Sequence, residues 1–378
     1  MELIYKNKKN KTQILEKTQS AKLEYLKPQL SSNLVNMLIK GDNLRVMQTL
    51  IKNYDLKDKV DLVYIDPPFA TNTVFRGSEL RTSHVSSSFN DNVAYNDYLL
   101  GADYLEFLRE RLFLIRELMS EHGSIYLHID YKIGHYVKII MDEVFGVKNF
   151  RNDITRIKSN PKNFSRKAYG NIKDLILFYT KTNNYIWNEP KHERSIGEVE
   201  RLFSKVDAKG RYYTTNPLHA PGETTNGNTG KKWKGMLPPM GRHWRYDPKV
   251  LDELDAKGLI EWSKTGNPRK IVYADEMPYK KLQDIWEFKD PSRPIYPTEK
   301  NINLLRTIIS TSSNSNSIVL DCFCGSGGTL IASKMLGRNW IGIDNSEMAI
   351  KISLRRLKDA QSNLFQQDAF AYLKEIDS

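Results

Sequence analysis

The chain has 378 residues, of which 40% are hydrophobic, so it is long enough for two domains or for one α/β domain with a large insertion. Lys and Arg number 57 against 45 Asp and Glu, and the net charge of +12 favours a polyanionic partner. No apolar run reaches the length of a membrane span, and the first residues lack the apolar core of a signal peptide, so we expect a cytoplasmic protein without a membrane contact. Cys322 and Cys324 are poorly placed to bridge each other, and two thiols alone make no metal site, so no metal is expected.

The chain opens with short elements. Residues 1–27 are polar and basic and predict a frayed arm or a solvated helix. A short strand at 37–39 precedes the turn at Gly41 and Asp42, after which Asn43 can open a helix. Asp42 could bind a ligand or merely cap that helix, and from this segment alone we favour the cap.

A second strand, at 60–65, ends abruptly in Asp66, Pro67, Pro68 and Phe69. The prolines lack the N–H that a central strand needs, so the chain must leave the sheet at its carboxyl edge, where open α/β sheets build their sites. The Asp66 carboxylate and the Pro67 carbonyl can accept the hydrogens of an exocyclic amino group, and Phe69 can stack on a planar base. The alternative is a plain strand-to-loop turn in which Asp66 serves as a cap.

Strands and helices then alternate. A Ser/Thr-rich stretch at 70–92, expected to be a mobile wall over the site, is followed by a helix ending at Met119, a strand at 124–129, a helix near 136–144 and a strand at 174–179. This alternation predicts a parallel, doubly wound α/β sheet. His128 is either a catalytic residue or a histidine of the core or just behind the site, and we favour the second interpretation.

The composition changes between 185 and 291, a stretch that holds all tryptophans but one. A small helix after Asp247 and a hairpin turning at Gly266 and Asn267 are expected there. Basic and aromatic residues interleave in a pattern that can contact phosphates and stack on bases, the basic ones being Lys231, Lys232, Lys234, Arg242, His243 and Arg245. An ordinary subdomain with a basic surface is the alternative.

After 291 the chain returns to alternating helices and strands, with a glycine-rich turn between Asp321 and a helix. Its glycines let the backbone come close to a ligand, and Asp344, at the end of the next strand, can accept hydrogen bonds from ribose hydroxyls. The pattern G-x-G-G differs from that of dinucleotide binders. Asp321 would repel a pyrophosphate but attract the cationic end of S-adenosylmethionine, so a methyl donor is favoured over NAD.

These motifs together resemble the β class of DNA amino-methyltransferases, in which D-P-P-F precedes the cofactor motif, here D-C-F-C-G-S-G-G-T, with the target-recognition region between them. G-D-N-L, F-G-V-K-N-F and Y-P-T-E-K are similar to those of adenine-specific enzymes of restriction–modification systems, both type II enzymes and type III Mod subunits. The resemblance implies a Rossmann-like methyltransferase core at 31–184, its catalytic half, and 292–378, its cofactor-binding half. It also implies an N-terminal arm at 1–30 and an inserted target-recognition region at 185–291.

The resemblance also implies roles for single residues. Asp66, Pro67, Pro68 and Phe69 would hold the flipped base. The cofactor would contact Asp42, Thr298, Lys300, Asp321, Phe323, Gly325, Gly327 and Asp344, with Asp368 a rival of Asp42 at the adenine. Thr298 and Lys300 would contact its methionine carboxylate. The class more often has Tyr where Phe69 stands, and often has His where Tyr296 stands and Pro where Asn301 stands.

The implied reaction is methyl transfer from S-adenosylmethionine to adenine N6 of a base flipped out of double-stranded DNA. The acid of D-P-P-F favours adenine, since the cytosine-N4 enzymes of the class more often carry Ser there. Three alternatives stay open: a cytosine-N4 enzyme, a DNA-binding specificity subunit that needs a partner, and an enzyme that methylates protein or RNA, against which the large basic insert speaks. The class also allows a cognate restriction endonuclease and a homodimer as partners.

Overall fold

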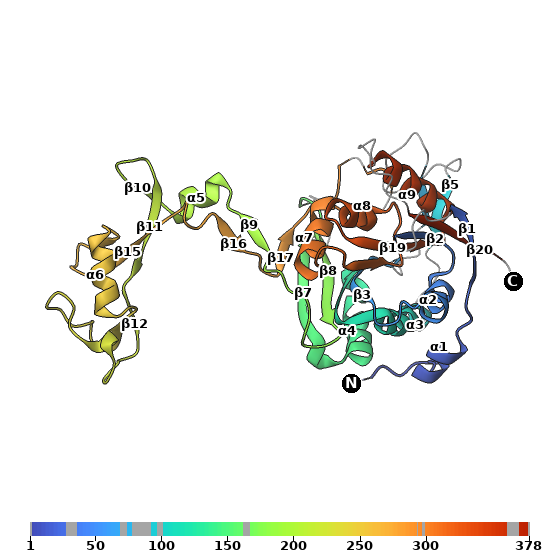
Figure 1. Ribbon diagram of the computed structural model, residues 1–378, viewed down its shortest axis with the longest axis horizontal. Coiled ribbons are helices and arrows are strands. Elements are labelled where there is room, and N and C mark those ends of the chain that lie inside the picture. The colour runs from blue at the N-terminus through green and yellow to red at the C-terminus, as the bar shows by residue number, and fades with distance from the viewer. Residues whose placement is uncertain are drawn as a thin grey trace. The chain divides into compact units, whose positions relative to one another are not determined.

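A computed structural model describes residues 2–27, 36–68, 74–77, 92–96, 101–161, 167–292, 294–296, 299–360 and 370–376. The chain forms two compact units, Met1–Pro190 with Gln283–Ser378, and Lys191–Leu282 (Figure 1). Phe69, Thr298 and Asp368 lie outside the described residues, as does the expected wall at 70–92 except for the strands β4 (Val74–Gly77) and β5 (Asn92–Asn96). Within the described ranges, no helix is long and apolar enough to cross a membrane.

The first unit is built on a mixed sheet, which has ten strands among the described residues, in the order β1-β20-β2-β19-β18-β3-β6-β8-β7-β17. Their bounds are β1 (Lys22–Lys27), β2 (Met37–Lys40), β3 (Val60–Ile65), β6 (Met119–Ile129), β7 (Phe150–Ile157), β8 (Lys173–Thr180), β17 (Ile285–Glu287), β18 (Ile318–Asp321), β19 (Asn339–Asp344) and β20 (Ala371–Ile376). The six neighbours from β20 to β6 run parallel. Strand β8 is antiparallel to β6 and β7, and β1 is antiparallel to β20.

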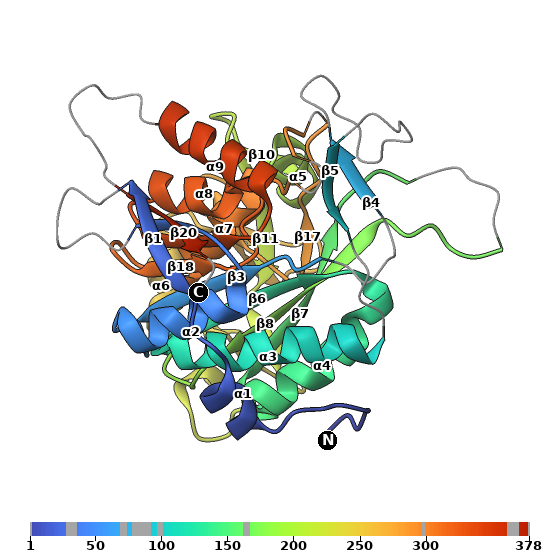
Figure 2. The ribbon, with the colours of Figure 1, turned by 90° about the vertical axis from the view of Figure 1, so that its right-hand side faces the viewer.

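Helices cover both faces of this sheet (Figure 2). One face carries α2 (Asn43–Asn53), α3 (Ala102–Leu118) and α4 (Tyr131–Phe145), and the other carries α7 (Ile302–Ser312), α8 (Gly328–Met335) and α9 (Glu347–Asp359). The 3-10 turn η1 (Val147–Asn149) follows α4. Helix α4 begins before the predicted 136–144 because Asp130 caps it, accepting a hydrogen bond from Lys132 N at 2.9 Å. The prediction of a doubly wound, mostly parallel α/β fold is confirmed.

The chain leaves β3 and β18 in opposite directions across the sheet. These two strands are parallel neighbours, with Val319 opposite Leu62. From β18 the chain passes through α8 to β19 on one side, whereas from β3 it passes through α3 to β6 on the other. The carboxyl ends of β3 and β18 therefore form a topological switch point, the place where doubly wound sheets bind ligands.

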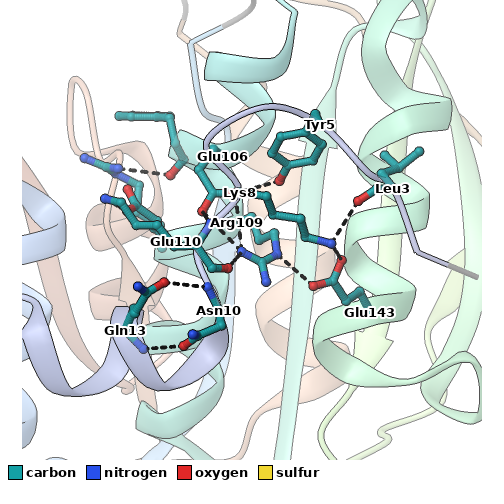
Figure 3. Close-up of polar contacts among 12 residues, drawn as sticks. Leu3, Tyr5, Lys8, Asn10, Gln13, Glu106, Arg109, Glu110 and Glu143 are labelled. Atoms are coloured by element: carbon teal, nitrogen blue, oxygen red, sulfur yellow. Dashed lines mark hydrogen bonds and ion pairs between the residues drawn. The ribbon is translucent and has the colours of Figure 1, made fainter.

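The N-terminal segment is docked on the first unit, so the prediction of a frayed arm is wrong for residues 2–27, whereas a mostly exposed helix with Ile14 buried agrees with the alternative of a solvated helix. It contains α1 (Lys11–Lys17) and the edge strand β1. Tyr5 donates to Glu106 Oε2 at 2.6 Å, and Lys8 Nζ lies 2.8 Å from Glu143 Oε2 (Figure 3). Acidic side chains on α3 and α4 thus bind the basic segment that composition alone assigned to solvent.

The second unit contains a four-stranded antiparallel sheet in the order β10-β11-β15-β14. Its elements are β9 (Lys191–Glu193), α5 (Ile196–Leu202), β10 (Lys205–Val206), β11 (Tyr212–Pro217), β12 (His219–Pro221), η2 (Asn228–Gly230), β13 (Arg242–Trp244), α6 (Pro248–Ala256), β14 (Ile260–Trp262), β15 (Pro268–Tyr273) and β16 (Tyr279–Lys281). The predicted helix after Asp247 and the predicted hairpin at Gly266 are confirmed. A small core of Leu218, Trp233, Trp244 and Leu251 supports them.

Candidate functional site

Two acidic residues stand at the switch point. Asp321 is the last residue of β18, and Asp66 follows β3 directly. Pro67 is buried immediately after Asp66, and neither proline can donate a ladder hydrogen bond, so the strand ends here as predicted. The parallel pairing of β3 with β18 therefore brings the predicted catalytic segment beside the predicted cofactor loop.

The two carboxylate oxygens of Asp66 have different surroundings. Lys300 Nζ lies 2.6 Å from Oδ2, and both side chains are largely buried. Oδ1 is buried and has no hydrogen-bond partner among the residues that the structure describes. A buried acceptor without a donor is costly, so the structure keeps one oxygen of Asp66 ready for a donor that it does not itself supply.

The glycine-rich loop is shaped by hydrogen bonds to Asp321 and Asp344. Asp321 accepts from Phe323 N at 3.0 Å and from the Thr329 hydroxyl at 2.6 Å. Asp344 accepts from Gly325 N and from Ser346 N, each at 2.8 Å. Each carboxylate oxygen keeps further lone pairs for a ligand.

One glycine of this loop is required by space as well as by backbone conformation. Gly327 has φ +76°, and a Cβ there would lie 2.8 Å from the Ser353 hydroxyl. Gly325 also has a positive φ, of +51°. The tight turn lets α8 begin at the loop, close to the ends of β18 and β19.

The electrostatics of Asp321 suit a cationic ligand. Burial raises the pKa of Asp321 to about 7, although its hydrogen bonds from Thr329 and Phe323 act in the other direction. No Lys, Arg or His in the described ranges forms an ion pair with it. A positive charge bound beside Asp321 would favour its ionised form, so the residues present fit the sulfonium and ammonium groups of S-adenosylmethionine.

Asp42 has a structural role in the unliganded protein. It caps α2 by accepting from Leu44 N at 2.9 Å and Arg45 N at 3.1 Å, and Arg111 lies 3.3 Å from its other oxygen. This is the cap that the segment alone favoured. Its side chain is 43% exposed, so it can still meet a ligand.

Asn43 and Arg111 support the cofactor loop and were not predicted from the sequence. Asn43 donates to the Cys322 carbonyl at 2.7 Å and accepts from Arg111 Nε at 2.6 Å. Arg111 also lies over the Phe107 ring, which is 6.2 Å from the ring of Phe323. In the sequence, Arg111 looks like any polar residue of an amphipathic helix, so nothing nearby indicates that it supports the cofactor loop.

Behind Asp66, the buried side chains of Tyr64, His128 and Asp174 are linked by hydrogen bonds and form a polar chain. The Tyr64 hydroxyl lies 3.0 Å from His128 Nδ1, and His128 Nε2 lies 3.2 Å from Asp174 Oδ2. His128 is fully buried, as the favoured interpretation expected. Tyr64 and Asp174 occupy strand positions, and only the pairing of β6 with β3 and β8 brings them to His128.

The basic residues predicted to bind DNA lie in the second unit. Lys231, Lys232, Lys234, Arg242 and Arg245 are exposed and His243 is half-buried. Lys234 pairs with Asp255, and Arg242 lies 3.1 Å from His219 Nδ1. The expected stacking of interleaved aromatics on bases is wrong for Trp233 and Trp244, because both are buried in the unit's core.

Neither thiol has the surroundings of a nucleophile. Cys322 and Cys324 are free and buried, and burial raises the pKa of both thiols. Within the described part of the chain, no three His, Cys, Asp or Glu side chains are grouped in a way that could hold a metal ion.

Comparison with known proteins gives consistent matches. A family model described as DNA methylase matches residues 60–355. The type II methyltransferase M.EcaI of Enterobacter cloacae is 42% identical over 329 residues, which cover 85% of this chain and 69% of that protein. The StyLTI Mod subunit of a type III restriction-modification enzyme from Salmonella typhimurium is 26% identical, and the match covers 79% of this chain but only 50% of that subunit.

Solved structures match at lower identity. The crystal structure of the M1.HpyAVI–SAM complex is 18% identical with a TM-score of 0.44, covering 85% of this chain and 99% of that chain. The PvuII DNA methyltransferase, described as cytosine-N4-specific, is 12% identical with a TM-score of 0.48, covering 89% of this chain and 95% of that chain.

Proposed function

This chain belongs to the DNA methylase family, and we propose that it transfers a methyl group from S-adenosylmethionine to adenine N6 in double-stranded DNA. The observation that carries the proposal is the buried, unpartnered Oδ1 of Asp66 at the switch point, beside the loop that begins at Asp321. Asp66 would thus accept an amino hydrogen at the end of β3, and Asp321 would attract a cation at the end of the neighbouring strand β18.

The protein's part in the reaction is to bind and orient the amino group. The lone pair of an aromatic amine is delocalised into the ring, so the amine is a poor nucleophile. Hydrogen bonds accepted by Asp66 Oδ1 and the Pro67 carbonyl favour the pyramidal amine and free its lone pair. Positioning and electrostatics then supply the rate, without a covalent intermediate on Cys322 or Cys324.

The cofactor is held by the loops around Asp321 and Asp344. When bound, it supplies an electrophilic methyl group whose bond to sulfur breaks as the bond to nitrogen forms. Asp321 and Phe323 would hold its methionine end, and Asp344 would accept from the ribose hydroxyls. Gly325 and Gly327 would give the backbone the room for this approach, Asp42 would contact the adenine, and Thr298 and Lys300 would contact the carboxylate.

The second unit reads the DNA. Its exposed basic side chains contact phosphates, and the target base leaves the duplex to reach Asp66 and Phe69. We place the enzyme in a restriction–modification system of the cytoplasm, with a cognate endonuclease and a second copy of the chain as its protein partners. The relatives named as type II methyltransferase and Mod subunit support this assignment.

Nucleoside analysis tests the proposal. The protein is incubated with labelled S-adenosylmethionine and mixed-sequence duplex DNA, and the digested DNA is separated by chromatography. We expect the label in N6-methyladenine. Label in N4-methylcytosine would overturn the choice of base, and no label despite tight cofactor binding would favour a specificity subunit that needs a partner.

A further inference from the structure

The polar chain behind Asp66 defines which nitrogen of His128 carries a hydrogen. Asp174 accepts from His128 Nε2 and also lies 2.6 Å from Lys158 Nζ and 3.6 Å from Arg156. Burial would raise the pKa of Asp174, but the hydrogen bond from His128 and the charge of Lys158 outweigh it and hold that pKa well below its ordinary value. Asp174 is therefore an ionised acceptor, and His128 Nε2 must be the donor.

The other nitrogen of His128 must then be an acceptor. Burial lowers the pKa of the His128 imidazole, against the opposing effect of Asp174 and Asp66, so the neutral ring prevails at neutral pH. A neutral ring with its hydrogen on Nε2 has a lone pair on Nδ1. Burial keeps the pKa of Tyr64 well above its ordinary value, and its hydroxyl donates to that lone pair at 3.0 Å.

This arrangement has a direct consequence for Asp66. His128 Nδ1 lies 3.9 Å from Asp66 Oδ1, which is beyond hydrogen-bond distance and farther than the Tyr64 oxygen, so a hydrogen on Nδ1 would reach the carboxylate only after a movement of the ring. With the hydrogen on Nε2 instead, His128 offers Asp66 no donor. This tautomer is consistent with the surroundings of Oδ1, which has no hydrogen-bond partner among the described residues.

We propose that His128 is a positioning residue for methyl transfer, held by Asp174 in the tautomer that leaves Asp66 Oδ1 free for the target amino group. The proposal rests on the proposed function of Asp66, and adds the device that keeps this acceptor available. In many functional sites, a partner on one ring nitrogen of a histidine fixes which nitrogen carries the hydrogen, and so determines what the other nitrogen can do.

The proposal has a defined pH dependence. The titratable and charged groups facing His128 are Tyr64 and Asp66 from the β3 side, Asp174 from β8, and Lys300, with Arg156 and Lys158 acting through Asp174. Protonated His128 carries a positive charge and a hydrogen on Nδ1 as well, which would compete with the target amino group for Asp66 Oδ1. The turnover number should therefore fall as the pH drops through the lowered pKa of His128, below its ordinary value of 6.5.

Two variants separate this role from a merely structural one. In Asp174→Asn, the amide oxygen would stay on Lys158 and the amide N–H would donate to Nε2, which moves the imidazole hydrogen to Nδ1. In Tyr64→Phe, Asp174 still selects the Nε2–H tautomer. We expect Asp174→Asn to lower kcat at least about tenfold with an unchanged affinity for S-adenosylmethionine, and Tyr64→Phe to keep most of kcat.

The tautomer is measured directly by 15N NMR of histidine-labelled full-length protein without DNA or cofactor. We expect His128 to be protonated on Nε2 in the wild type and on Nδ1 in Asp174→Asn. Wild-type protonation on Nδ1, or an Asp174→Asn variant with the reversed tautomer and unchanged kcat, would overturn the proposal. Failure of the proposed function is distinct, because the wild type would then not methylate DNA whatever the tautomer.

Discussion

Lys300 Nζ lies 2.6 Å from Asp66 Oδ2, so the residue expected at the cofactor's carboxylate is paired with the residue expected to hold the base. The two side chains are 12% and 14% exposed. The pair links the segment after β3 to the segment before α7, which are far apart in sequence. One carboxylate oxygen is thereby held while the other stays free.

Removal of Lys300 should destabilise the protein. Lys300→Met leaves a buried carboxylate without its cation, and loss of one partner of a buried pair costs about 3–5 kcal/mol. Urea unfolding measures the change. The double variant Lys300→Met with Asp66→Asn should recover most of the loss, and equal stability of the wild type and Lys300→Met would contradict a buried pair.

Cofactor binding should depend on the ionisation of Asp321. Burial raises its pKa to about 7 in the unliganded protein, and a cationic ligand favours the ionised form, so binding should release a proton near that pH. Affinity should therefore weaken as the pH falls below about 7, by up to about tenfold per pH unit. Isothermal titration calorimetry in buffers of different ionisation enthalpy counts the protons.

The same shift predicts the sign of a stability change. A carboxyl whose pKa is raised by folding stabilises the protein fully below its unfolded pKa and loses this contribution as the pH rises through about 7. Asp321→Asn should flatten this part of the stability profile of the unliganded protein and should release no proton on binding. A cofactor affinity that stays constant from about pH 5.5 to 7.5 would contradict the assignment.

The main topology was predictable because it depends on local patterns. Prolines end the strand at Asp66, and glycines form the turn after Asp321. The order of strands and helices along the chain then predicts a doubly wound sheet. The docking of residues 2–27 was not predictable in this way. It depends on Glu106 and Glu143, which lie on α3 and α4 and come close only in the folded chain.

The N-terminal contact should contribute to stability through Arg109, which is almost fully buried and donates to the Lys9 carbonyl at 2.8 Å. Its Nε lies 2.8 Å from Glu143, and Glu106 lies 3.2 Å away (Figure 3). Arg109→Met should lower the free energy of unfolding by about 3 kcal/mol, because two carboxylates lose a buried partner. Lys57, in the turn before β3, forms a more exposed pair with Glu117 of α3. Lys57→Met, which breaks that pair, should cost less than about 1 kcal/mol.

Urea unfolding compares these two variants, and limited proteolysis tests the docking itself. Arg109→Met should be cut faster within residues 2–27 than the wild type. If both variants lose the same stability, then the contact is no stronger than an ordinary surface ion pair.

DNA affinity should depend on exposed lysines of the second unit. Replacement of both Lys231 and Lys232 by Ala should weaken binding to all sequences and reduce the slope of log affinity against log salt by about 2. Lys6 and Lys11, which are exposed on the N-terminal segment, provide a control with the same change of charge. Equal effects of the two double variants would indicate a general effect of net charge.

The details of the site were less predictable than its place in the fold. The G-D-N-L and D-P-P-F motifs point to Asp42 and Asp66, but the charged partners of these acids are distant in sequence: Arg111 lies on α3 and Lys300 lies in the segment before α7. Arg111 and Asp174 look like ordinary members of an amphipathic helix and a buried strand. Likewise, alternating Lys and Trp around Trp233 suggested base stacking, whereas the large rings were needed to build a core in a small unit.

The most direct test compares methyl transfer by the wild type, Asp66→Ala and Asp58→Asn in a single turnover with duplex DNA and labelled S-adenosylmethionine. Asp58 lies in the turn before β3 and controls for the loss of an acidic charge. We predict that Asp66→Ala loses at least about 100-fold in rate at saturating S-adenosylmethionine, and that Asp58→Asn resembles the wild type. Methylation of DNA by Asp66→Ala at the wild-type rate would contradict the central claim that Asp66 holds the amino group during transfer.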